Sequence, residues 1–183
     1  MSEFYHVARN DISSINKFEL MQIDRNLEHR YLYSIEEFEK SKLDLYNNNF
    51  SKFGQRYLDT PFPFVTTKNH DEYIKNDFII EIAFELVRRL KFPEKKSRFV
   101  SYFGCLSLED AQYIKHETFK NNGIIYKVEC ENFFKADMSL VNTGGSILGI
   151  QILAEKYWSS QASKNPFWEI LMEAPVKIID KIE

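Results

Sequence analysis

The chain has 183 residues, of which 44% are hydrophobic and 15% aromatic, so we expect a folded globular protein rather than a disordered one. The formal net charge of −3 provides no overall basic field, which argues against tight, sequence-independent binding of nucleic acid. Cys105 and Cys130 fit no zinc-binding or CxxC spacing, so we expect no metal site and a reduced, cytoplasmic chain. The first residues lack the pattern of a signal peptide, and no apolar run is long enough to span a bilayer, so we expect no membrane association.

A first strand is predicted over residues 4–9, where aromatic, apolar and polar side chains alternate. Its polar candidates, His6 and Arg9, would point to opposite faces of a regular strand. Residues 15–46 are charged and helix-prone, and Ser34 can cap the last helix in that stretch. Residues 50–70 are interpreted as a loop, because Pro61 and Pro63 resist a regular helix.

The clearest helix is predicted over residues 71–90, ended by Pro93. Its apolar residues recur at helical spacing and predict the face that packs on the core: Ile79, Ile82, Ala83, Leu86, Val87 and Leu90.

We expect the fold to be organised around residues 97–111. Their first half is β-branched and aromatic and predicts a strand, a glycine breaks it, and a serine three residues before an aspartate predicts a helix over 107–120. This arrangement would bring Arg98, Ser101 and Tyr102 near a helix N-terminus, where an anion such as a pyrophosphate can be held. The alternative is an ordinary strand-to-helix connection with a surface arginine.

The remaining segments are predicted as a strand over 124–130, a polar connection containing Asp137, a helix over 147–158 and two strands within 167–182. Glu169 lies between Trp168 and Ile170 in an otherwise apolar strand. An ionised carboxylate is costly to bury unless it is paired, so Glu169 is either on a surface face or functional.

These strands, in this order, resemble the ADP-ribosyltransferase superfamily. Residues 4–9 (FYHVAR) resemble its first core strand, residues 99–104 (FVSYFG) its second, and residues 167–171 (FWEIL) the strand that carries its key glutamate. The whole chain is similar to a small bacterial family of uncharacterised proteins. The resemblance implies an α+β fold, a split antiparallel β sandwich around an NAD-binding cleft. It would form a single domain over residues 1–183, with residues 15–93 as a mostly helical insertion after the first strand.

The sequence also departs from the superfamily's patterns. His6 and Arg9 are both present, as are Ser101 and Tyr102, so the His-Tyr-Glu and Arg-Ser-Glu classes are not separable. Protein-arginine transferases carry Glu or Gln two residues before the key glutamate, whereas this chain has Phe167, which argues against arginine as the acceptor.

The resemblance implies an NAD-dependent ADP-ribosyltransferase or NAD glycohydrolase. A toxin or a defence effector is one biological role that it allows. NAD would be the substrate, and the acceptor a protein, a nucleic acid or a small molecule. Cleavage of the nicotinamide–ribose bond develops oxocarbenium-like charge on the sugar, which a fixed carboxylate stabilises. An aromatic ring can stack on nicotinamide, a histidine can bind a ribose hydroxyl, and an arginine can bind the pyrophosphate. The predicted catalytic residues are Glu169, His6 and Tyr102, and the predicted NAD-binding residues are His6, Arg9, Arg98, Ser101 and Tyr102.

Two other functions are compatible with the same residues. One is a non-catalytic nucleotide- or protein-binding module on the same fold. The other is a nucleic-acid-processing member of the fold, in which Lys95, Lys96 and Arg98 contact phosphate.

Overall fold

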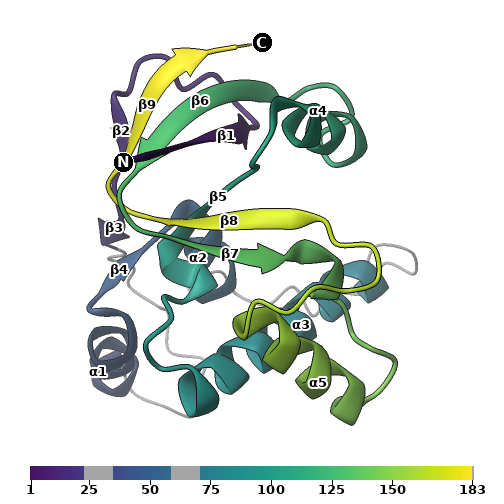
Figure 1. Ribbon diagram of the computed structural model, residues 1–183. Helices are drawn as coiled ribbons and strands as arrows, with labels where there is room; N and C mark the ends of the chain where they lie inside the picture. The colour runs from purple at the N-terminus through teal and green to yellow at the C-terminus, as the bar shows by residue number, and fades with distance from the viewer. Residues whose placement is uncertain (23–34, 59–70, 183) are drawn as a thin grey trace.

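A computed structural model describes residues 1–22, 35–58 and 71–182. Two antiparallel sheets form its centre (Figure 1). The first has the strand order β1 (Ser2–Ala8), β6 (Ile124–Cys130), β9 (Val176–Lys181) and β2 (Lys17–Phe18). The second has the order β5 (Ser101–Gly104), β8 (Trp168–Glu173) and β7 (Phe133–Asp137). A separate two-stranded pair consists of β3 (Met21–Gln22) and β4 (Asn49–Phe50).

A bridge between Tyr5 and Cys105 joins the two sheets. These residues exchange backbone hydrogen bonds of 3.0 and 2.7 Å, which tie the middle of β1 to the end of β5. Gly104 permits this approach, because a Cβ atom there would lie 3.3 Å from the Tyr5 carbonyl oxygen and 3.1 Å from the Met172 side chain. The bridge thereby brings the N-terminal strand next to the strand that pairs with β8.

Helices pack against both sheets (Figure 1). Helices α3 (Asp71–Lys91) and α5 (Ile147–Trp158) pack on the second sheet around Phe84, Trp158 and Leu171. Helix α4 (Leu108–Glu117) packs on the first sheet. Helices α1 (Ile35–Tyr46) and α2 (Lys52–Leu58) lie beside the second sheet, and short 3₁₀ turns, η1 (Arg98–Val100) and η2 (Met138–Leu140), precede β5 and follow β7. No helix in these described stretches is both long and apolar enough to cross a bilayer.

The alternation of side chains along β8 decides where Glu169 points. Ile170 and Met172 belong to the apolar core between the two sheets, whereas Leu171 packs with α3 and α5 on the other face. Because successive side chains of a strand point to opposite faces, Glu169 lies on the helix side with Leu171.

The predicted α+β class is confirmed, and so are the longer predicted elements. Strand β1 covers residues 4–8 of the prediction over 4–9 and ends before Arg9, and β6, β8 and β9 match the later strands. Helices α3, α4 and α5 form where they were expected, and the Ser107 hydroxyl caps α4 by accepting a 3.1 Å hydrogen bond from the Asp110 N–H.

Several predictions for the short elements are wrong. Residues 17–18 and 21–22 are strands rather than helix, residues 52–58 form α2 rather than a loop, and Asp137 ends a strand, β7, rather than lying in a connection. The signal for α2 was Ser51, whose hydroxyl accepts a 3.1 Å hydrogen bond from the Gly54 N–H in the manner of a helix cap. The predicted cap and the two loop prolines, Ser34, Pro61 and Pro63, lie outside the described residues.

The predicted core face of α3 is also largely wrong. Ile79, Ile82 and Leu86 are about half exposed, and Leu90 is 81% exposed. Of the predicted set, Ala83 and Val87 pack in the core. The buried face instead carries charged residues with the remaining apolar ones: Phe78, Ile80, Glu81, Phe84, Glu85 and Arg88. Charge pairing with arginines, described below, explains why acidic residues occupy it.

Candidate functional site

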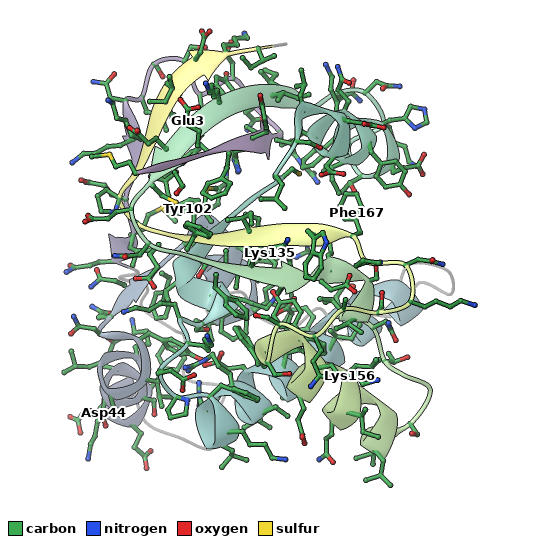
Figure 2. The ribbon with its side chains drawn as sticks, viewed as in Figure 1. Glu3, Asp44, Tyr102, Lys135, Lys156 and Phe167 are labelled. Carbon is green, nitrogen blue, oxygen red and sulfur yellow. The ribbon has the colours of Figure 1, made fainter. Side chains whose placement is uncertain are left out.

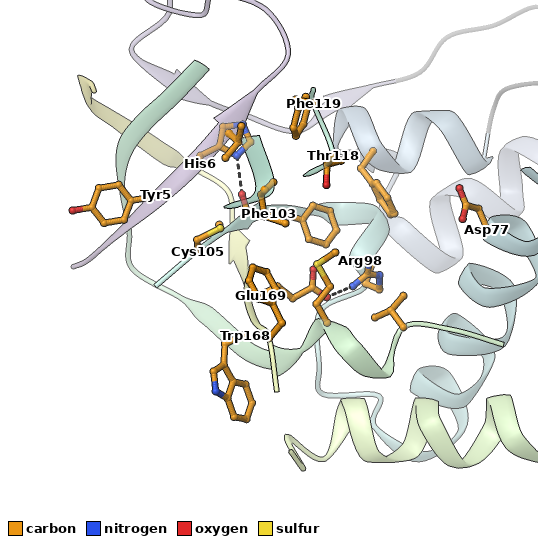
Figure 3. Close-up of a pocket in the computed structure, with 17 residues that line it drawn as sticks. Tyr5, His6, Asp77, Arg98, Phe103, Cys105, Thr118, Phe119, Trp168 and Glu169 are labelled. Carbon is orange, nitrogen blue, oxygen red and sulfur yellow. Dashed lines mark hydrogen bonds and ion pairs between the residues drawn. The ribbon is translucent and has the colours of Figure 1, made fainter. Parts of the chain in front are cut away.

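A pocket of about 450 Å³ lies where β1, β5 and β8 meet α3 and α4 (Figure 3). Its volume falls within the range of about 300–1,000 Å³ that is typical of small-molecule sites. Aromatic side chains form much of its wall: Tyr5, Phe53, Phe103, Phe119, Phe167 and Trp168. We call it the Glu169 pocket; its charged and imidazole side chains are His6, Asp77, Arg98 and Glu169.

Glu169 is only 6% exposed, and its carboxylate is held at one oxygen. The Oε1 atom accepts hydrogen bonds from Arg98 Nη1 at 2.5 Å and from the Tyr157 hydroxyl at 2.6 Å. Every hydrogen bond that the described residues make to this carboxylate reaches Oε1, so Oε2 is the oxygen left for a ligand in the pocket.

Arg98 is buried between two carboxylates. Its Nε atom donates to both carboxylate oxygens of Glu81, at 3.0 and 3.2 Å, while Nη1 donates to Glu169. The guanidinium carbon lies 4.8 Å from the centre of the Phe103 ring, a cation–π distance. Burial tends to lower the pKa of Arg98, but the charges of Glu169 and Glu81 outweigh it and hold that pKa well above its usual value.

This arrangement corrects the prediction that Arg98 stands at a helix N-terminus, ready to bind a pyrophosphate. It also removes Arg98 from the phosphate contacts of a nucleic-acid-processing protein. A guanidinium that is 7% exposed must have its charge compensated inside the protein, and Glu81 and Glu169 supply that compensation.

Glu81 and Tyr157 complete the network around Arg98. Burial raises the pKa of Glu81, while the charge and hydrogen bonds of Arg98 oppose that rise. Burial also raises the pKa of Tyr157 well above its usual value, so its hydroxyl stays protonated and donates to Glu169.

His6 lines the same pocket from β1, on the opposite side of Phe103 from Glu169 (Figure 3). Its Nδ1 atom lies 2.7 Å from the Phe103 carbonyl oxygen and therefore carries the donated proton. Burial lowers the pKa of His6, with partial opposition from this hydrogen bond, so the ring is neutral at pH 7. A neutral ring with Nδ1 protonated keeps Nε2 as an acceptor.

Tyr102 does not line the Glu169 pocket. It pairs with Met172 across β5 and β8, three positions from Glu169, so the two side chains lie on opposite faces of the sheet. Tyr102 lies near the end of β8 opposite to Phe167 (Figure 2). The aromatic on the Glu169 side is its neighbour, Phe103.

The ring of Phe18 already covers Tyr102. The two rings stack with their centres 4.8 Å apart, and Phe18 also meets the ring of His6 edge-on at 4.9 Å. The Tyr102 hydroxyl donates a 2.7 Å hydrogen bond to the Glu19 carbonyl oxygen. In this arrangement Tyr102 is not placed to stack on a ring held beside Glu169.

A second pocket of about 560 Å³ adjoins the first, and we call it the Arg9 pocket. The two share five lining residues, which are His6, Val7, Phe53, Phe103 and Phe119. The charged residues of the Arg9 pocket are Arg9, Lys17, Glu19 and Lys52, so cations predominate in it. The predicted residues Ser101 and Tyr102 also line it, although Ser101 is fully buried and its hydroxyl donates to the Ser97 carbonyl oxygen.

The structure therefore brings His6, Arg98 and Glu169 to one pocket, and places Arg9, Ser101 and Tyr102 at the other. The residues that sequence reasoning missed are Phe103, Tyr157 and Glu81. A signal for Glu81 was present, because Asp77, Glu81 and Glu85 recur every four residues along α3. Like charges at that spacing destabilise an isolated helix, so their recurrence indicates cationic partners elsewhere in the fold.

Asp137 fastens the loop that leads into β8. Its buried carboxylate accepts backbone hydrogen bonds from Ser163 at 2.7 Å and from Phe167 and Ser139 at 2.9 Å each. Burial tends to raise the pKa of Asp137, but these hydrogen bonds outweigh it and the pKa lies below its usual value. The ionised carboxylate thus fixes the backbone two residues before Glu169.

Cys105 also lines the Glu169 pocket, but its thiol is not a ready nucleophile. Burial, reinforced by the charges of Asp110 and Glu169, raises its pKa to about 12, so the thiolate is scarce at neutral pH. Within the residues that the structure describes, no group of three His, Cys, Asp or Glu side chains is arranged to hold a metal ion.

Comparison with known proteins assigns the chain to a protein family. No curated protein matches the chain. A family model described as "Protein of unknown function (DUF2441)" matches residues 4–183, a span that includes every pocket residue described above. The chain therefore belongs to the DUF2441 family.

Proposed function

We propose that the protein cleaves the nicotinamide–ribose bond of NAD, as an ADP-ribosyltransferase or an NAD glycohydrolase. The observation that carries this proposal is that His6 of β1 and Glu169 of β8 line one pocket, although they come from opposite ends of the chain. Two antiparallel sheets joined by the Tyr5–Cys105 bridge are also compatible with the split β sandwich that the resemblance implies.

The charges of the two adjoining pockets support NAD as the ligand. Acidic residues outnumber the one arginine in the Glu169 pocket, whereas cationic residues outnumber the one acid in the Arg9 pocket. NAD has a positively charged nicotinamide ring at one end and a negatively charged pyrophosphate further along. The ring and its ribose would occupy the Glu169 pocket and the phosphates would face Arg9 and Lys52, with His6 between them.

The chemistry follows from the held carboxylate. As the carbon–nitrogen bond breaks, its electron pair leaves with neutral nicotinamide and the ribose carbon gains positive charge. Arg98 and Tyr157 fix Oε1 of Glu169, so that Oε2 is preorganised to stabilise this charge. Nε2 of His6 accepts a hydrogen bond from a ribose hydroxyl. The acceptor then attacks the ribose carbon and loses a proton; with water as acceptor the products are ADP-ribose, nicotinamide and a proton.

The test is nicotinamide release from NAD by the purified protein, followed by chromatography. Glu169→Gln is expected to lower the rate roughly a hundredfold to a thousandfold, since it removes the charge that stabilises the transition state. Glu173→Gln is the matched control, because Glu173 is at the other end of β8, does not line the Glu169 pocket and is expected to have little effect. Nicotinamide release that survives Glu169→Gln would rule out this mechanism.

One observation favours a second candidate, a nucleotide-binding module without catalysis. Glu169 is already ion-paired with Arg98, and a buried, paired carboxylate is suited to a structural role. Isothermal titration with NAD distinguishes the two functions. Binding without nicotinamide release indicates the module, whereas binding followed by release indicates the enzyme.

A further inference from the structure

The buried network at the Glu169 pocket contains more negative than positive charge. Glu81 and Glu169 are 5% and 6% exposed, and both pair with the one guanidinium of Arg98. When both carboxyls are ionised, their two negative charges exceed its single positive charge by one unit. Burial raises the pKa of Glu81, so this excess is complete only above that pKa. Tyr157 does not change this sum, because its raised pKa keeps the phenol neutral. Asp77, one turn before Glu81 on α3, adds a further acidic group to the pocket lining.

The geometry of Arg98 explains why Glu81 governs this excess. Both carboxylate oxygens of Glu81 accept hydrogen bonds from Nε of Arg98. Glu169 accepts from Nη1 through Oε1 alone. Without Glu81, the positive charge of Arg98 would be available to Glu169 alone and the pair would be neutral. With Glu81 present, the guanidinium is shared, and the carboxylate that lines the pocket keeps an uncompensated share of negative charge.

We propose that Glu81 is a specificity-determining residue, which makes the Glu169 pocket select a cationic ring over a neutral ring of similar shape. For the ligand of the proposed function, on which this inference rests, the selected form is oxidised NAD, with its positively charged nicotinamide ring. The rejected form is NADH, with its neutral dihydronicotinamide ring. Glu81 reaches the ligand through Arg98 and is therefore a positioning residue rather than a catalytic one.

The experiment compares the dissociation constants of NAD and NADH for the wild type and two variants by isothermal titration at pH 8, where ionised carboxylates are favoured. The wild type is expected to prefer NAD. Glu81→Gln removes one nearby charge and should reduce the ratio of the two affinities roughly tenfold. Glu85→Gln is the matched control. Glu85 is buried one turn further along α3, pairs with Arg88 and Arg89 and does not line the Glu169 pocket. Its substitution should therefore leave the ratio of the two affinities unchanged.

Folding of each variant is checked by thermal unfolding, and Glu81→Met, with the same expectation, replaces Glu81→Gln if the latter does not fold. Equal affinities of the wild type for NAD and NADH, or no binding of either, overturn the inference without any variant. An unchanged ratio in a folded Glu81 variant also overturns it.

Two outcomes separate the inference from the proposed function. A preference for NAD that Glu81→Gln abolishes, without nicotinamide release by the wild type, supports the inference and refutes the proposed function. Nicotinamide release by a wild type that binds NAD and NADH equally supports the proposed function and refutes the inference.

Discussion

Replacing Arg98 by methionine tests whether one guanidinium holds the centre of this fold together. Arg98→Met keeps much of the side-chain volume but leaves Glu81 and Glu169 buried beside one another without a cation. Breaking a buried ion pair by removing one partner costs about 3–5 kcal/mol, because the remaining charge is left uncompensated. We expect a loss of this size in the free energy of unfolding at pH 7, measured by urea titration.

The loss should depend on pH with a defined sign. Without Arg98, burial and the neighbouring Glu169 carboxylate raise the folded-state pKa of Glu81 above the unfolded value of about 4.3. A carboxyl with a raised folded-state pKa binds its proton more tightly in the folded protein. Its proton-linked stabilisation is therefore complete below the unfolded pKa and is lost as the pH rises through the folded one. The deficit of Arg98→Met should consequently be smaller at pH 5 than at pH 8.

A second variant separates charge from packing. Glu81→Gln combined with Arg98→Met removes one of the two stranded carboxylates, so it should recover about 1–2 kcal/mol of the loss at pH 8. A cost of Arg98→Met below about 1 kcal/mol at pH 7, or the same cost at pH 5 and pH 8, would contradict this role of Arg98.

Two further predictions concern Asp137 and Cys105. Asp137→Asn should lower stability by about 1–3 kcal/mol at neutral pH, because the amide replaces a carboxylate that accepts three backbone hydrogen bonds. The pKa of Asp137 is lowered in the folded state, so its stabilisation is present above pH 3.8 and is lost as the pH falls through the folded-state pKa. Urea titrations of both proteins should therefore converge in acid, and a difference that persists there would contradict this role of the carboxylate. The Cys105 thiol has a pKa of about 12, so at pH 8 it should react with a disulfide reagent roughly a thousandfold more slowly in the folded protein than in urea. Equal rates would show that the thiol is not buried.

The sequence by itself determined the elements whose signals are local. The apolar spacing within residues 71–90, the serine cap before α4 and the apolar strands around Glu169 were sufficient to locate α3, α4 and β8. It also identified His6 and Glu169 as polar side chains in apolar strands, and the structure places both at one pocket. The short strands were not predicted from the sequence. The two-residue strands β2, β3 and β4 form because of their partner strands rather than because of their own residues.

Tertiary structure alone decided the role of each charged group. Only the packing of α3 against η1 and β8 shows that Glu81 and Glu169 share Arg98, and that the half-exposed residues Ile79 and Leu86 lie away from the core. Register alone puts Tyr102 and Glu169 on opposite faces of the second sheet. The physical reason is that hydrophobic spacing is a property of neighbouring residues, whereas compensation of a buried charge depends on groups brought together from distant parts of the chain.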